Sequence, residues 1–125
     1  MNKEHAEHNE EVCKLLLSTK KFNDWVITTA FYSSLHFALN KLFPLTTGAD
    51  SYENIDSYYV KNKLHGKCSK HIAICSLVSS NLPSIRSEYK WLLDVCMTAR
   101  YHNYKIKEVT ANRAVTHLDK IKAHC

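Results

Sequence analysis

Glycine and proline are scarce in this chain, with only two of each among 125 residues. β-Sandwiches and barrels need many tight turns, and such turns draw heavily on glycine and proline. The scarcity therefore argues against a sheet-rich fold and favours helices joined by few turns. No apolar run approaches the ~18 residues of a membrane-spanning helix, and the first residues, MNKEHAEH, lack the apolar core of a signal peptide. We therefore expect a cytoplasmic protein with no membrane association.

Several familiar functional signatures are also missing. The five cysteines are odd in number and include no CxxC pair, so we expect reduced thiols rather than a disulfide framework. There is no glycine-rich phosphate loop, no GxSxG motif and no acid pair at the spacing of metal-dependent nucleases. The common enzyme classes built on these motifs are thus excluded, and we expect neither a cofactor nor a metal.

What is present is a globular composition with an excess of positive charge. Hydrophobic residues make up 45% of the chain and two tryptophans are included, which indicates a folded domain, and the length favours one domain over residues 1–125. The formal net charge is +5, with eight further histidines. This balance suits RNA, DNA, a nucleotide or an acidic partner protein, although soluble proteins without such partners often carry the same excess.

Apolar residues at helical spacing predict five helices and no sheet. They are expected at residues 2–19, about 23–43, 67–80, 84–100 and 110–123, the last capped by Thr110. Residues 44–51 are expected to form a loop, and residues 52–63 fit either a short helix or an irregular segment. The fold class is therefore all-α, an antiparallel bundle of about five helices.

The second predicted helix is apolar around most of its circumference, which is typical of a central, buried helix. Trp25 is one of its apolar residues. If the indole ring is fully buried, replacing it with alanine is expected to cost about 3–5 kcal/mol of stability.

The most informative stretch is Arg100-Tyr101-His102-Asn103-Tyr104, which lies where a helical pattern ends. A guanidinium can hold a phosphate in a fixed fork geometry, an imidazole can transfer a proton near neutral pH, and a tyrosine can stack on a base. Lys105 and Lys107 follow directly and could bind flanking phosphates. The alternative is that the stretch only ties a helix end to its neighbours.

Two other histidines are candidates for the same surface. His36 lies inside the predicted buried helix, either as a hydrogen-bonded core residue or pointing into a groove beside the end of the 84–100 helix. His65 begins a His65, Cys68, His71 repeat that resembles zinc ligands. Because Gly66 interrupts the helix and no fourth ligand follows, we interpret His65 instead as a polar contact at a cleft.

The order and spacing of several motifs resemble the HEPN superfamily, in particular its small stand-alone bacterial members. The resemblance rests on WVITTAFYSSLHFALNKL at residues 25–42, on His65, on Tyr89-x-x-Leu92 and on Ala99-Arg100-Tyr101. It implies a helical bundle that forms a homodimer. It also implies RNA as the ligand, a metal-independent endoribonuclease activity, and an antitoxin or defence-system partner protein, because many HEPN proteins act in toxin–antitoxin and phage-defence systems.

The chain departs from the HEPN hallmark, in which a histidine follows the arginine after four to six residues. His102 is only two residues beyond Arg100, and on a continuing helix the two would point about 200° apart. They converge only if the helix ends between them or if two copies meet. Two functions therefore stay open: RNA cleavage, with Arg100 on the phosphate and His102 as acid or base, or non-catalytic binding of RNA, a nucleotide or a partner protein.

Overall fold

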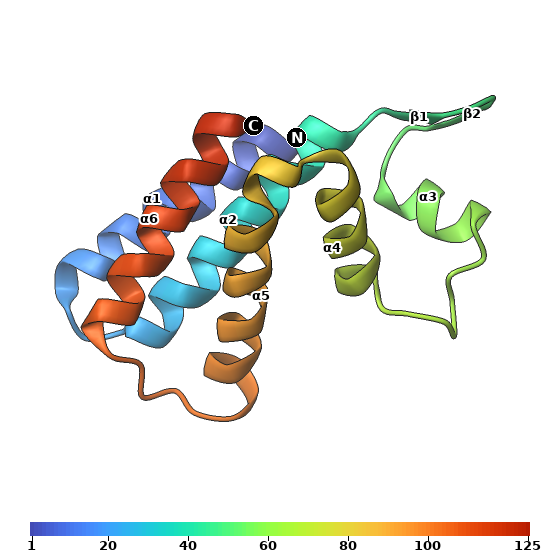
Figure 1. Ribbon diagram of the computed structural model, residues 1–125. Helices are drawn as coiled ribbons and strands as arrows, with labels where there is room; N and C mark the ends of the chain where they lie inside the picture. The colour runs from blue at the N-terminus through green and yellow to red at the C-terminus, as the bar shows by residue number, and fades with distance from the viewer.

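The computed structural model describes residues 1–125 and is 74% helical, so the predicted mainly α-helical fold is confirmed (Figure 1). Six α-helices, one 3-10 turn and two short strands follow one another along the chain. In order they are α1 (Asn2–Thr19), α2 (Asn23–Leu42), β1 (Leu45–Thr47), β2 (Asp50–Tyr52), α3 (Ile55–Lys61), α4 (Lys70–Asn81), η1 (Pro83–Ile85), α5 (Arg86–Tyr101) and α6 (Glu108–His124).

Helix α2 lies at the centre, with α1, α5 and α6 packed around it and α4 beside α5. Val26, Ile27 and Phe31 are fully buried, because they lie on the sides of α2 that these helices cover. The expectation that Trp25 belongs to this core is wrong, since its side chain is 53% exposed. Trp25 lies in the first turn of α2, where it borders a groove rather than a packed helix.

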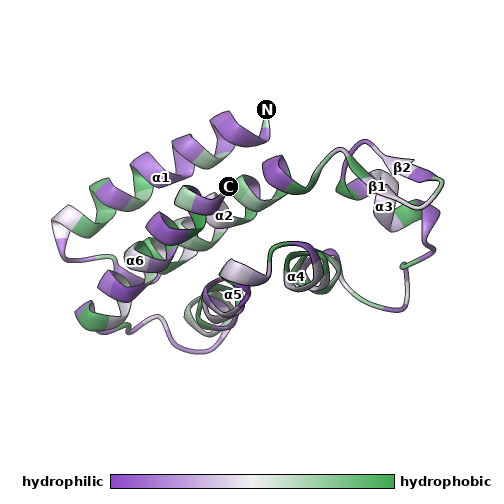
Figure 2. Ribbon diagram, turned by 45° about the horizontal axis from the view of Figure 1, so that its top comes forward, coloured by the Kyte–Doolittle hydropathy of each residue, from purple (hydrophilic) through white to green (hydrophobic).

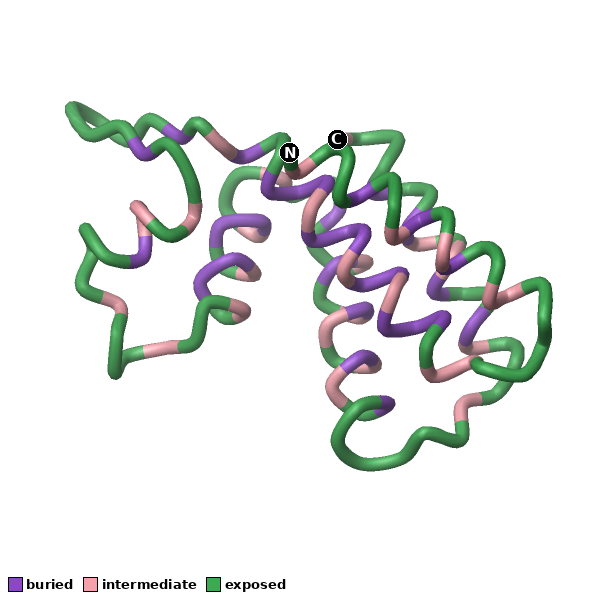
Figure 3. Tube along the Cα trace, turned by 180° about the vertical axis from the view of Figure 1, so that it is seen from behind, coloured by how far each residue is buried: buried purple, intermediate pink, exposed green.

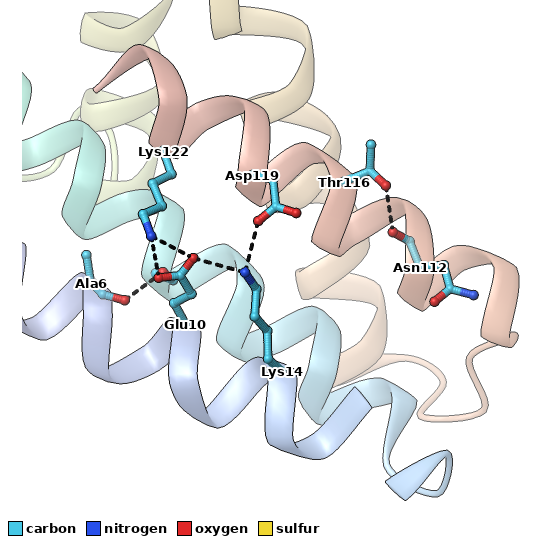
Figure 4. Close-up of polar contacts among 8 residues, drawn as sticks. Ala6, Glu10, Lys14, Asn112, Thr116, Asp119 and Lys122 are labelled. Carbon is cyan, nitrogen blue, oxygen red and sulfur yellow. Dashed lines mark hydrogen bonds and ion pairs between the residues drawn. The ribbon is translucent and has the colours of Figure 1, made fainter. Parts of the chain in front are cut away.

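A buried carboxylate, that of Glu10, ties α1 to α6 (Figure 4). Glu10 accepts hydrogen bonds of 3.0 and 3.2 Å from Lys122 and one of 3.3 Å from Lys14. Lys14 in turn pairs with Asp119 at 3.3 Å. Burial by itself would raise the pKa of Glu10, but the hydrogen bonds and charges of the two lysines outweigh it and the pKa is lowered. The ionised carboxylate therefore favours the folded state.

Residues 44–69 extend from the end of α2 as an arm that carries the two strands and α3 (Figures 1 and 2). The predicted loop at residues 44–51 is wrong, because β1 and β2 form an antiparallel hairpin in which Leu45 pairs with Tyr52. Gly48 turns the hairpin with a φ of 59°, a left-handed conformation that glycine adopts without steric cost. Leu45 and Tyr52 are both buried, so they anchor the hairpin to the core.

The starts of α4 and α6 differ from expectation, and for residues 52–63 the structure shows the short helix that was one of the two alternatives. The segment at 52–63 contains a real helix, α3, whose N-cap Asn54 accepts a hydrogen bond from the backbone of Ser57. Helix α4 begins at Lys70 rather than at residue 67, because the Ser69 hydroxyl caps it. Helix α6 begins at Glu108, so Thr110 lies inside its first turn and is not its cap.

Buried positions follow the helices around α2, whereas most of the arm is exposed (Figure 3). No helix of the structure has the length and apolar character that crossing a bilayer requires.

Candidate functional site: a groove around Arg100

A groove of about 480 Å³ lies between α1, α2 and the end of α5. We call it the Arg100 groove; its lining residues are His5, Asn9, Trp25, Thr28, Thr29, Tyr32, His36 and Arg100. Trp25, Thr29, Tyr32 and His36 fall at helical spacing, which places them along one face of α2. The floor of the groove is therefore a single helical stripe, and α1 and α5 supply its two walls.

Arg100 is fixed by a tyrosine of α2. Its Nη1 atom donates a hydrogen bond of 2.6 Å to the hydroxyl of Tyr32. The guanidinium carbon also lies 5.2 Å from the centre of the Tyr101 ring. No carboxylate lies within ion-pair distance of Arg100, and a guanidinium has five N–H donors. Most of its donors, and its whole charge, are thus free to bind an anion.

Tyr32 is held from behind by aromatic neighbours. Its ring meets Phe31 edge-on at 5.2 Å and His71 of α4 at 6.2 Å between ring centres. Burial lowers the pKa of His71, and the positive charge of Arg100 lowers it further. His71 is therefore neutral near pH 7 and adds no charge repulsion behind Arg100.

Two imidazoles in the lining of the groove, one from α1 and one from α2, stack on each other. The rings of His5 and His36 lie 3.9 Å apart between centres, with 20° between their planes. The Nδ1 atom of His36 is 3.0 Å from the side-chain oxygen of Asn2. Since an amide oxygen only accepts hydrogen bonds, this contact places the His36 proton on Nδ1 and leaves Nε2 as an acceptor.

The charge state of His36 follows from its surroundings. Burial lowers its pKa, and the neighbouring ring of His5 lowers it further. A neutral imidazole with a free Nε2 can accept a proton at neutral pH. His36 is thus the group in the groove best suited to act as a general base.

A second hollow, of about 310 Å³, adjoins the groove on the other side of Arg100. We call it the Tyr104 hollow; it shares Trp25, Thr28 and Arg100 with the groove and adds Asp24, Ala99 and Tyr104. The Tyr104 ring is 67% exposed. The Asp24 carboxylate takes part in none of the hydrogen bonds or ion pairs of the structure.

The structure brings three of the predicted site residues together: Arg100 and His36 in the groove, and Tyr104 in the adjoining hollow. For His36 it combines parts of the two alternatives, because the side chain is hydrogen-bonded to Asn2 and also lines the groove. His102 follows α5 as its C-cap residue, is exposed, and lines neither the groove nor the hollow. The side chain that contacts Arg100 in the groove is Tyr32, and the joint role of Arg100 and His102 stays a prediction.

The remaining predicted residues lie elsewhere. Lys105 and Lys107 are exposed in the connection between α5 and α6 and line neither cavity. His65 is exposed on the arm, where its ring meets Tyr59 at 4.5 Å. His71 points to Phe31 instead of toward His65, and no group of three or more potential metal-ligating side chains forms.

Sequence reasoning missed His5, Asn9, Tyr32 and the position of Trp25 in the groove. One signal was available: His5 and Asn9 are one helical turn apart, as are Tyr32 and His36, so each pair shares a helix face. Nothing in the local pattern indicates that these two faces meet Arg100, because the contact joins three helices.

Comparison of the chain with protein-family models, with curated proteins and with solved structures finds no match. The resemblance to the HEPN superfamily thus stays a prediction from sequence pattern, and the proposals below rest on the geometry of the groove.

Proposed function

We propose that the protein binds RNA in the Arg100 groove. The observation that carries this proposal is the Arg100 guanidinium, which Tyr32 holds at the rim of the groove and no carboxylate neutralises. A guanidinium in this position can bind a phosphodiester through two donors. Trp25 presents a half-exposed ring beside it, on which an unpaired base can stack.

The choice of RNA among polyanions comes from the resemblance to HEPN proteins. The same resemblance favours a cytoplasmic homodimer with an antitoxin or defence-system partner. Since Arg100, Tyr32 and His36 all belong to one chain, the groove does not depend on the second copy.

A salt titration of RNA binding tests the proposal. Replacing Arg100 with alanine should weaken binding to single-stranded RNA. It should also make the slope of log affinity against log salt concentration less steep, by the amount expected for the loss of about one phosphate contact. Arg113 of α6 is the matched control, because its guanidinium lies over the Trp91 ring of α5 and lines neither cavity. Equal affinities and equal salt slopes for wild type and Arg100→Ala would contradict the proposal.

A second candidate function, metal-independent RNA cleavage, is favoured by the stacked histidines. In this scheme the Nε2 atom of His36 takes the proton of a ribose 2′-hydroxyl, and the 2′-oxygen attacks the adjacent phosphorus. Arg100 stabilises the charge on the phosphoryl oxygens, and a protonated His5 supplies the proton that leaves with the 5′-oxygen. The products are a 2′,3′-cyclic phosphate and a 5′-hydroxyl, whose formation with chelator present is the assay. Non-catalytic binding predicts neither product.

A further inference from the structure

The Tyr104 hollow differs in chemistry from the groove that it adjoins. Arg100 is its only cation, and the other polar or aromatic side chains in its wall are Asp24, Trp25, Thr28 and Tyr104. We propose that this hollow receives an unpaired guanine base next to the phosphate on Arg100, and that the Asp24 carboxylate recognises the base. This inference rests on the proposed RNA binding and names the base that the site selects.

The aromatic residues make the hollow suitable for a base. Trp25 is 53% exposed and Tyr104 67% exposed, and both rings border the same space. Solvent-exposed aromatic rings in a basic groove are the usual stacking platforms for single-stranded nucleic acid. The volume of about 310 Å³ is at the lower end of the range for small-molecule pockets, about 300–1,000 Å³, and suits one base rather than several.

The position of Asp24 separates the base from the phosphate. A free carboxylate repels a phosphate, so the phosphate is expected on the Arg100 side and the base on the Asp24 side. Apart from the backbone hydrogen bonds of the helix, Asp24 takes part in one hydrogen bond. Its backbone oxygen accepts that bond from the Thr28 hydroxyl, at 2.9 Å. Both carboxylate oxygens thus stay free to accept hydrogen bonds from a ligand.

Guanine is the base whose edge best matches a free carboxylate. Its Watson–Crick edge offers two adjacent donors, the N1–H and the N2 amino group, which two carboxylate oxygens can accept together. Adenine and cytosine place an acceptor nitrogen beside their single amino group, and uracil places its one N–H between two carbonyl oxygens, so each brings an acceptor against the carboxylate. A bidentate contact of this kind discriminates by about five- to a hundredfold. Because the edge is occupied in a duplex, the site requires an unpaired base.

Asp24 also lies in the first turn of α2, where a carboxylate interacts favourably with the helix dipole. A role confined to helix stability predicts no effect of Asp24 on base preference. Measuring the preference among bases, and not only the affinity for RNA, therefore separates base recognition by Asp24 from a role in helix stability.

The experiment compares short uridine oligoribonucleotides that contain one guanosine, inosine, adenosine or cytidine, by fluorescence anisotropy at fixed salt. Wild type should bind the guanosine oligomer about tenfold more tightly than the adenosine or cytidine oligomers. Inosine, which lacks the N2 amino group, should fall between them. Asp24→Asn should lose most of the preference for guanosine, because only one of the two polar atoms of a side-chain amide is an acceptor. Asp56→Asn, on the arm, is the matched control and should keep the preference.

Equal binding of all four oligomers by wild type would overturn the guanine assignment and leave RNA binding intact. A preference that survives in Asp24→Asn would also overturn it. No binding of any oligomer would remove the proposed function together with this inference, so the two failures are distinguishable.

Discussion

The hydroxyl of Tyr32 accepts a hydrogen bond of 2.6 Å from Nη1 of Arg100, across 68 positions of the sequence. This contact joins the middle of α2 to the last turn of α5 and fixes the one unpaired guanidinium of the groove. Tyr32 therefore positions Arg100, and substitution of Tyr32 can test this role by its effect on RNA binding.

Replacing Tyr32 with phenylalanine should weaken RNA binding about tenfold or more, because a hydrogen bond to a charged group contributes about 1.5–3 kcal/mol. The same substitution in an Arg100→Ala background should cause almost no further loss. Anisotropy titrations of the four variants give this comparison. Additive losses would show that Tyr32 acts on RNA independently of Arg100.

If the protein cleaves RNA, replacing His36 with glutamine should lower the rate constant at least a hundredfold, since it removes the general base. Replacing His102 with glutamine should change the rate less than about threefold, because His102 lines neither cavity. Single-turnover cleavage with chelator measures both. A larger loss of cleavage rate for His102→Gln than for His36→Gln would favour the joint action of Arg100 and His102 that the sequence predicted.

The exposure of Trp25 can be tested against a neighbouring core residue. Phe31→Ala should destabilise the protein by about 3–5 kcal/mol because the ring is fully buried. Trp25→Ala should cost less than about 1.5 kcal/mol, because half of its ring is already in solvent. Urea denaturation followed by circular dichroism measures both values. A similar cost for the two substitutions would mean that Trp25 is buried in solution.

Glu10→Gln should destabilise the fold by about 1–2 kcal/mol, because it removes the charge that accepts hydrogen bonds from Lys14 and Lys122. Glu11 is the matched control, since it is adjacent, exposed and unpaired. Glu11→Gln should shift the free energy of unfolding by less than about 0.5 kcal/mol. Equal effects of the two substitutions would show that the ion pairs contribute nothing.

Stability should fall as the pH drops from 7.5 to 5.5. Burial lowers the pKa of His36, His71 and His117 below the ordinary 6.5, so in this window the unfolded chain binds more protons than the folded protein. The stabilisation is present above pH 6.5 and is lost as the pH falls toward the lowered values. Urea denaturation at several pH values should show this decline, and His71→Gln should flatten it. A flat wild-type profile would contradict the predicted linkage.

The helices and the central place of α2 could be predicted from the sequence, because both follow from the local spacing of apolar residues. The hairpin at residues 44–52 was not predicted, since its strands are three residues each and their burial depends on Leu45 and Tyr52 reaching a distant core. The start of α4 was misplaced by three residues because its Ser69 cap was not recognised in the pattern.

For the candidate site, the sequence by itself indicated Arg100, His36 and Tyr104 as candidates. Only the tertiary structure decided that His5, Tyr32 and His36 line one groove with Arg100, that His102 does not line it, and that Trp25 borders it. The physical reason is that helical periodicity states which residues share a face of one helix, whereas the neighbour that covers this face is set by packing between helices far apart in the chain.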